Sequence, residues 1–202
     1  MRTQLVIPAL FAGLASAGGN LETRSISAVQ AIKEIMPGAL SDCSKSDAPT
    51  ECSTPEQAAP FLIESLKQRT TGEIAMVLSV IGVETADLKY RVNKNPGIPG
   101  QGTANMMSPS YVRKYAEFLK LPIEGRSEAD ILQLVIEDDF NHFNSAVWFI
   151  NQECTEDVKA KMRMGTDEGY KLYLEKCIVT ENSDLRQAYW ARAKKVFNLT
   201  GK

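Results

Sequence analysis

The 202-residue chain contains a single histidine, His142, and only four cysteines. A closed metal site needs several imidazole, thiolate or carboxylate ligands at suitable spacing, and the sequence contains no C-x-x-C pair. Nucleophilic catalysis by serine–histidine or cysteine–histidine arrangements also depends on histidine and free cysteine, so these schemes have little support in this sequence. The glycine-rich P-loop and dinucleotide-binding motifs are also absent. We therefore predict no bound metal and no cofactor.

An excess of basic side chains is missing as well. The chain has 23 Lys and Arg residues against 25 Asp and Glu residues, which gives a formal net charge of −2. Nucleic-acid-binding proteins and proteins attracted to anionic lipid usually present a basic face, so we predict neither partner. After the first 17 residues, no run approaches the roughly 18 apolar residues of a spanning helix. The sequence therefore predicts no membrane span, and we expect a monomer.

The first 17 residues have the pattern of a secretory signal peptide. One positive charge, Arg2, precedes an apolar run from Leu5 to Leu14, and Ala15-Ser16-Ala17 offers small residues at a cleavage point before Gly18. Cleavage removes that one basic residue, so the mature chain has 22 basic and 25 acidic side chains and a net charge of −3. We expect a secreted, extracellular protein with one globular domain over residues 18–202.

All four cysteines follow this cleavage point, and an even count in an oxidising compartment predicts two disulfides. Three pairings are possible, and we favour Cys43–Cys52 and Cys154–Cys177 because each closes a short local loop. Asn198 begins a single N-glycosylation sequon, Asn-Leu-Thr. The signal peptide and the sequon together are typical of a fungal or similar eukaryotic source.

The spacing of apolar residues predicts an all-α fold. We expect helices over residues 21–36, 53–68, 71–86, 109–120, 127–137, 142–153, 155–163, 166–178 and 183–197. The segment 18–55 is expected to form a peripheral N-terminal helix and a disulfide-tied loop. No stretch has the alternation of a strand, apart from a short extended piece within 88–93. The run from Ile74 to Val83 is apolar nearly all round, so the helix of about 72–86 belongs at the centre of the fold.

Glu84 stands directly after this apolar run. An ionised carboxylate costs several kcal/mol to bury, so its pKa should rise unless it is paired. A carboxyl group with a raised pKa is suited to general acid catalysis near neutral pH. The longest irregular stretch, residues 91–109, follows and is rich in Gly, Pro and Asn. Long loops of this kind are often functional, and its polar side chains could hydrogen-bond sugar hydroxyls.

Two short stretches resemble the lysozyme-like superfamily, most closely its lytic transglycosylase and goose-type lysozyme branch. Val83-Glu84-Thr85 matches the catalytic Glu and the small hydroxyl residue that end a central helix. The stretch from Gly102 to Pro109 matches the glycine-, methionine- and proline-containing motif of the next helix, with Asn105 and Met107 departing from the pattern. The similar region covers roughly residues 71–118. The resemblance implies a lysozyme-like helical domain with Glu84 as general acid.

The same resemblance implies a secreted glycoside hydrolase or lytic transglycosylase. Its substrates would be β-1,4-linked N-acetylated aminosugar polymers of the chitin or peptidoglycan type, and the negative net charge favours the neutral polymer. Because glycosidases often pair two carboxylates, Asp87 and Asp139 are the secondary acid candidates. The expected contacts to the polysaccharide or oligosaccharide substrate are Tyr90, Gln101, Thr103, Asn105, Met106 and Tyr111.

A non-catalytic secreted binding or host-interaction protein on the same scaffold is the alternative, which the departures at Asn105 and Met107 favour. The surroundings of Glu84 separate the two hypotheses. An enzyme needs Glu84 at the floor of an open groove, whereas a salt-bridged or sealed Glu84 favours the binding protein. His142 is expected in a helix-entry turn capped by Asp139 or Asn141.

Overall fold

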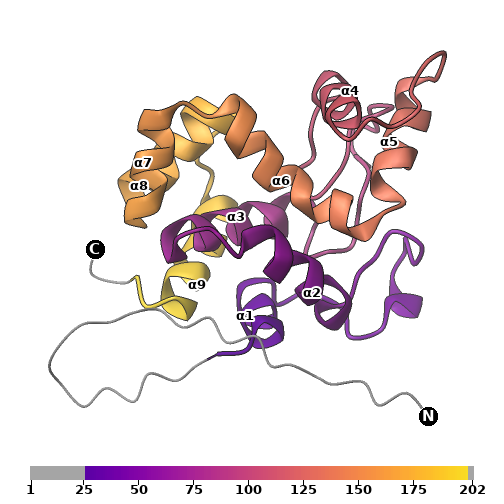
Figure 1. Cartoon of the computed structure of the whole chain (residues 1–202). Helices are drawn as coiled ribbons and strands as arrows, with labels where there is room; N and C mark the ends of the chain where they lie inside the picture. Colours follow the sequence, from indigo (N-terminus) through magenta and orange to yellow (C-terminus); the bar gives the residue numbers. More distant parts are fainter. Residues whose placement is uncertain (1–25, 200–202) are drawn as a thin grey trace, which may run out of the picture.

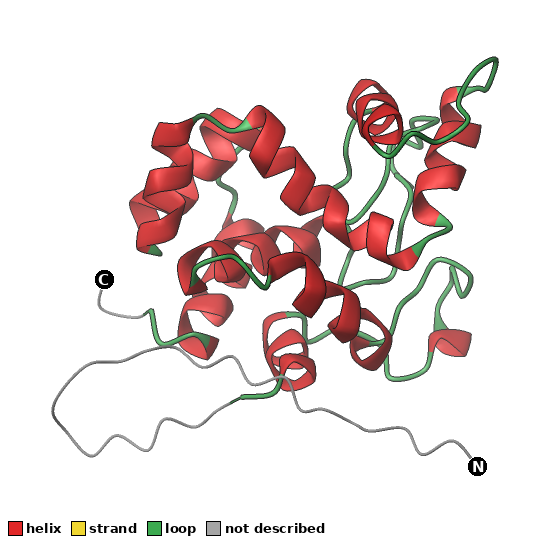
Figure 2. Cartoon of the chain, viewed as in Figure 1, coloured by secondary structure: helices red, strands yellow, loops and turns green. Residues whose placement is uncertain are grey.

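The computed structural model describes residues 26–199. The predicted signal peptide, the cleavage point before Gly18 and Thr200 of the sequon lie outside the described residues. Over the part that is described, the elements are helices, turns and loops without a strand, so the predicted all-α class is confirmed (Figure 2). In the same part of the chain, no helix is both long enough and apolar enough to cross a membrane.

The elements follow one another in the predicted order (Figure 1). They are α1 (Ala28–Ile35), η1 (Cys43–Lys45), α2 (Pro55–Leu66), α3 (Thr71–Glu84), α4 (Pro109–Phe118), α5 (Glu128–Ile136), α6 (Asp139–Glu153), α7 (Glu156–Met164), α8 (Asp167–Leu172), η2 (Tyr173–Ile178) and α9 (Asp184–Val196). The single helix predicted over 166–178 is divided, because η2 is a π-helix that continues α8.

The start of α6 corrects one expectation. The helix begins at Asp139, three residues before the predicted start at His142. Its cap is Asp138, whose side chain accepts a hydrogen bond from the backbone N–H of Asn141 at 2.8 Å, in place of Asp139 or Asn141. His142 therefore lies inside the first turn.

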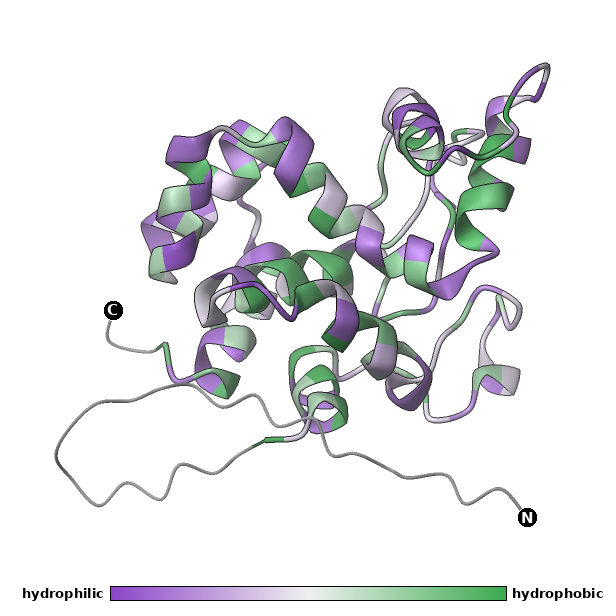
Figure 3. Ribbon diagram, viewed as in Figure 1, coloured by the Kyte–Doolittle hydropathy of each residue, from purple (hydrophilic) through white to green (hydrophobic). Residues whose placement is uncertain are grey.

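Helix α3 occupies the central position that was predicted for the apolar helix. Every residue from Gly72 to Gly82 is buried, and α3 packs against α1, α6, α7 and α9. Its start is fixed by a capping box, in which the Glu73 carboxylate accepts from the backbone N–H of Thr70 at 2.9 Å. Figure 3 shows hydrophobic residues along most of its length. This helix is the axis around which the others are arranged.

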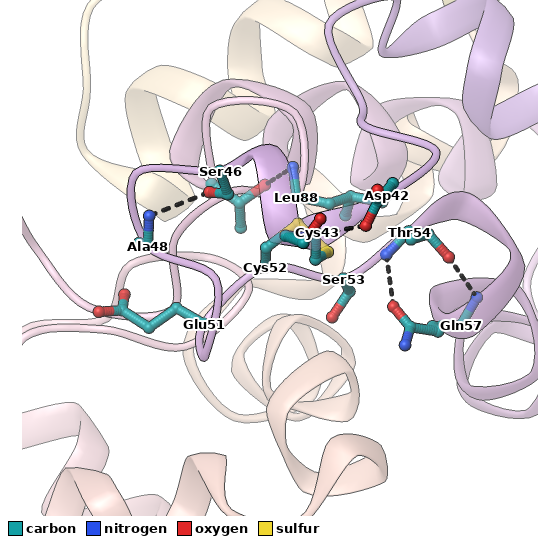
Figure 4. Close-up of a disulfide and its surroundings, with 12 residues drawn as sticks. Asp42, Cys43, Ser46, Ala48, Glu51, Cys52, Ser53, Thr54, Gln57 and Leu88 are labelled. Carbon is teal, nitrogen blue, oxygen red and sulfur yellow. Dashed lines mark hydrogen bonds between the residues drawn. A yellow bond between two sulfur atoms is a disulfide. The ribbon is translucent and has the colours of Figure 1, made fainter.

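Two disulfides join Cys43 to Cys52 and Cys154 to Cys177, the pairing that short local loops favour. The first one closes the loop between α1 and α2 (Figure 4). Just after it, the backbone N–H of Ser53 donates to the carbonyl of Leu88 at 2.9 Å. This hydrogen bond fastens the loop before α2 to the chain that leaves α3. The second disulfide connects the end of α6 to η2.

The extended piece expected within 88–93 is reduced to isolated bridges. Val92 pairs with Gly102, and Gly102 pairs with Met107. A Cβ atom on Gly102 would clash with the carbonyl oxygen of Arg91, so only glycine permits this approach. These contacts fold the long loop of residues 91–109 against the start of α4.

Candidate functional site

Glu84, the last residue of α3, forms an ion pair with Arg186 of α9. Its Oε1 lies 2.6 Å from Nη2 of Arg186, and the two side chains are only 17% and 11% exposed. A guanidinium at this distance stabilises the ionised carboxylate. A salt-bridged Glu84 is the arrangement expected for the non-catalytic binding protein, so this geometry favours that alternative over the glycosidase.

Asp87 holds the turn that follows α3. Its two carboxylate oxygens accept hydrogen bonds from the backbone N–H of Gly38 at 2.8 Å and from the hydroxyl of Tyr189 at 2.6 Å. Burial raises the pKa of Tyr189, and the bond to Asp87 raises it further, so the phenol remains a donor. Asp87 has a left-handed backbone, as do Ala86 and Leu88 on either side. The side chain therefore connects the loop after α1 to α9.

The predicted sugar-binding residues of the long loop bond to the protein itself. The Asn105 Oδ1 accepts from the Thr103 hydroxyl at 3.1 Å and from the Ser145 hydroxyl of α6 at 2.8 Å. The Gln101 amide donates to the carbonyl of Met106 at 3.3 Å. Thr103 has no exposed surface. These four predicted contacts fasten the loop to itself and to α6.

The two predicted aromatic contacts also lie in separate surroundings. The Tyr90 hydroxyl donates to Asp47 at 2.6 Å, next to the loop closed by the first disulfide. Tyr111 of α4 packs edge-on against Phe149 of α6, with 5.0 Å between ring centroids. The partners of these two rings thus belong to different parts of the molecule, and neither of these two interactions involves Glu84.

An open hollow of about 740 Å³ lies elsewhere on the molecule. It is formed where the disulfide-tied loop, the segment after α3 and the junction of α5 with α6 meet. Its lining consists of Thr50, Glu51, Arg91, Gln133, Ile136, Glu137 and Asp139. Of the predicted site residues, Asp139 is the one in this lining. We take this hollow as the candidate site.

Arg91 organises the hollow, although its side chain is only 13% exposed. Its guanidinium donates to the carbonyls of Glu51 at 3.0 Å and Ile136 at 2.9 Å, and to the Ser53 hydroxyl at 2.9 Å. The same group pairs with Asp139, with 2.6 Å between Nη2 and Oδ1. We call Arg91 and these four partners the Arg91 clasp. It joins three segments of chain and gives the hollow a polar, net acidic wall.

Arg91 and Glu51 are not among the site residues predicted from the sequence. Their sequence separation is 40 residues, and that between Arg91 and Ile136 is 45. No periodicity or motif marks a contact at such separations. Leu88, Tyr90 and Val92 alternate with polar residues around Arg91. This alternation predicts a short extended piece but does not identify the partners of Arg91.

His142 lies close to the Arg91 clasp but inside the core. The residue is 2% exposed, and its Nδ1 has no hydrogen-bond partner among the described residues. Burial holds the pKa of the imidazole well below its usual range, and the charge of Arg91 acts in the same direction. The ring is therefore neutral at physiological pH. Within residues 26–199, no group of three or more His, Cys, Asp or Glu side chains is arranged to hold a metal ion.

Comparisons with known proteins overturn the predicted activity. No family model matches the chain. The chain is 37% identical over 158 residues to a Fusarium oxysporum (strain Fo5176) protein named bifunctional dioxygenase (DOX)-epoxy alcohol synthase (EAS). The match covers 71% of this chain but 12% of the relative, so the chain spans about an eighth of that protein's length.

The name of this relative describes oxygen chemistry and not the cleavage of glycosidic bonds. The prediction of a glycoside hydrolase or lytic transglycosylase that acts on a polysaccharide substrate is therefore wrong. The resemblance to the lysozyme-like superfamily stays a prediction about the scaffold. The signal peptide also stays a prediction, because it lies outside the described residues.

Proposed function

We propose that this chain is a helical accessory module of an oxygenase system related to the Fusarium protein, and that it is not the oxygen-activating centre. The matched stretch is 12% of that relative, which leaves most of the protein to carry the two named activities. The observation that carries the proposal is the set of side chains available here for binding a redox group.

Biological oxygen chemistry uses haem, flavin, copper or non-haem iron. The metals are held by histidine, cysteine or carboxylate ligands, with tyrosinate as a less common choice. In the described part of this chain, all four cysteines are in disulfides and the one imidazole is enclosed. Burial raises the pKa of Tyr115 to about 12, so that phenol keeps its proton. This donor set does not fit a redox metal.

The hollow does not suit a flat ring cofactor either. Pockets for such ligands are lined mainly by apolar and aromatic side chains, with a few polar groups for orientation. Here Ile136 is the one apolar side chain in a lining of charged and polar residues. The wall is suited to polar contacts with another molecule, which is consistent with an accessory role.

Two disulfides support folding in an oxidising compartment. We therefore propose that the protein matures in the secretory pathway and acts outside the cell as a monomer. The mature chain, with a net charge of −3, has no excess of positive charge to attract nucleic acid.

The first test measures what the purified full-length chain binds. Fe²⁺ and haemin are added separately, and bound metal, absorbance and oxygen uptake are recorded for the wild type and for His142→Gln. The proposal expects far less than one equivalent of either probe, no oxygen uptake and no difference between the two proteins. One equivalent bound by the wild type and lost in His142→Gln would show that the chain is a redox centre.

The second test uses the Fusarium relative. Its cofactor content and its dioxygenase and epoxy alcohol synthase activities are compared before and after removal of the matched 158 residues. We expect the shortened protein to keep its cofactor and both activities per molecule. Loss of the cofactor on deletion contradicts the accessory role.

A further inference from the structure

Asn198 is a feature that the proposed function does not use. It follows α9 directly, is exposed, and has a left-handed backbone with φ of 54°. Helices often end on such a residue, and after glycine, asparagine adopts this conformation most readily. The next backbone N–H, that of Leu199, donates to the carbonyl of Lys194 at 2.9 Å. The end of α9 is thus a defined turn with Asn198 at its outer corner.

The neighbouring residue fixes this orientation. Leu199 is 4% exposed and packs against Gly165, where a Cβ atom would lie 3.2 Å from its Cδ2. Because Leu199 is anchored in the core, the residue before it is held towards solvent. A bulky group on the Asn198 side chain therefore meets no packed neighbour that it would displace.

We propose that Asn198 carries an N-linked glycan. The sequence supplies the required Asn-Leu-Thr sequon, with Thr200 as its hydroxyl residue. The inference rests on the secretory maturation proposed above and does not depend on the accessory role. The ligand class is an oligosaccharide transferred from a lipid-linked pyrophosphate donor.

The transfer is a substitution at the anomeric carbon of the donor sugar. A new bond forms between that carbon and Nδ2 of Asn198, while the bond from the carbon to the pyrophosphate oxygen breaks. The lipid pyrophosphate leaves with the electron pair of that bond, and Nδ2 loses one proton to a base of the transferase. No oxidant or reductant takes part.

The position of the turn predicts what the glycan leaves uncovered. Figure 1 shows the end of α9 on one side of the molecule, and α5, whose last turn borders the hollow, on the other. A glycan on Asn198 therefore extends away from the Arg91 clasp. The hollow therefore remains open to another molecule when Asn198 carries a glycan.

The test expresses the full chain in a yeast secretory host and measures the intact mass before and after treatment with peptide N-glycosidase. The variants are Asn198→Gln and Thr200→Ala, which destroy the sequon, and Thr200→Ser, which keeps it. We expect heterogeneous added mass in the wild type and in Thr200→Ser that the enzyme removes, and none in the other two. The enzyme should also convert Asn198 to Asp in the tryptic peptide.

Alkylation of free thiols in the same samples separates this inference from the maturation on which it rests. Secreted protein with all four cysteines protected but no glycan overturns the proposal for Asn198 alone. Protein that stays inside the cell with free thiols and no glycan overturns secretory maturation as well. Added mass that persists in Asn198→Gln places the modification elsewhere and contradicts the assignment to this residue.

Discussion

Glu84 and Arg186 lie 102 residues apart in sequence and form one nearly buried ion pair. The apolar run before Glu84 correctly predicts that it ends a buried helix, and elementary electrostatics predicts that such a carboxylate is either paired or protonated. The choice between these two states depends on which side chain α9 places beside it. That placement is a consequence of tertiary packing, which the local sequence does not contain.

Removing the charge of Glu84 should destabilise the fold. Glu84→Gln leaves the guanidinium of Arg186 buried without its counter-ion, and breaking such a pair from one side costs about 3–5 kcal/mol. We expect the low end of this range, about 3 kcal/mol, because both side chains retain some contact with solvent. Urea unfolding followed by circular dichroism measures the change in unfolding free energy.

A second substitution checks the cause. Glu84→Gln combined with Arg186→Met removes the unpaired charge and should recover part of the lost stability. Glu137→Gln, an exposed residue of the hollow, is the matched control and should change the unfolding free energy by less than about 0.5 kcal/mol. A Glu84→Gln protein as stable as the wild type would show that the pair contributes nothing.

His142 should make stability depend on pH. Its pKa in the folded protein is lowered by burial, so the unfolded chain binds a proton first as the pH falls. Stability is therefore full above the ordinary histidine pKa of about 6.5 and falls below it, by about 1.4 kcal/mol at pH 5.5. The unfolding free energy is measured between about pH 5 and pH 8, above the range in which carboxylates titrate.

His142→Gln provides the comparison, because the amide does not titrate in this range. Its unfolding free energy is expected to stay level from about pH 8 to pH 5.5, whatever its absolute value. The acids whose pKa values are lowered, such as Asp47 and Asp167, act only at still lower pH. Equal slopes for the two proteins would contradict the assignment to His142.

At the scale of the elements, helix identity was predictable and helix geometry was not. Capping sequences at Thr54 and Thr70 mark the starts of α2 and α3, because their side chains satisfy backbone donors that the helix leaves free. The change from α8 to a π-helix at Tyr173 has no comparable local signal. The π-helix packs beside α7 and is joined to the end of α6 by the link from Cys177 to Cys154, and the local sequence specifies neither contact.

The close contact between α3 and the end of α7 depends on Gly72. A Cβ atom there would lie 2.6 Å from Cα of Gly165 and 2.7 Å from the carbonyl oxygen of Met162. Both neighbours are backbone atoms, so Gly72→Ala must push the two elements apart, at a cost of about 1–3 kcal/mol. The better helix propensity of alanine offsets at most about 1 kcal/mol, so we expect a net loss of up to about 2 kcal/mol.

Thr71→Ala is the control for this variant, since it introduces the same residue one position earlier at an exposed site. Its unfolding free energy should stay within about 0.5 kcal/mol of the wild type. Thermal melting of the three proteins makes the comparison. A stabilised Gly72→Ala variant would mean that helix propensity outweighs the close approach.

At the scale of the whole molecule, the candidate site is a meeting of three segments at one guanidinium. Arg91 lies in the segment after α3 and bonds to the disulfide-tied loop through Glu51 and to the α5–α6 junction through Ile136 and Asp139. The disulfide-tied loop is predicted correctly, whereas the start of α6 is predicted three residues late. Their meeting point could not be predicted, because nothing in a single sequence specifies which distant segments become neighbours.

Arg91→Lys tests whether this one residue holds the three segments together. Lysine keeps the charge but has one ammonium group in place of the planar fork, so it cannot reach all four acceptors. A buried acceptor left without its partner costs about 1–3 kcal/mol. We expect a loss of at least about 2 kcal/mol and faster amide hydrogen exchange in residues 42–53 and in the first turn of α6.

The pattern of exchange distinguishes the clasp from a general loss of stability. Amides that exchange by openings that leave the clasp intact should keep their exchange rates, whereas those of the three segments should accelerate by the full loss of stability, through local opening. Lys94→Ala is the control, because it removes an exposed partner of Glu51 that contributes at most about 1 kcal/mol. If Arg91→Lys accelerates exchange evenly along the chain, the clasp does not act as a local fastening, and the hollow is maintained by the packing of the helices instead.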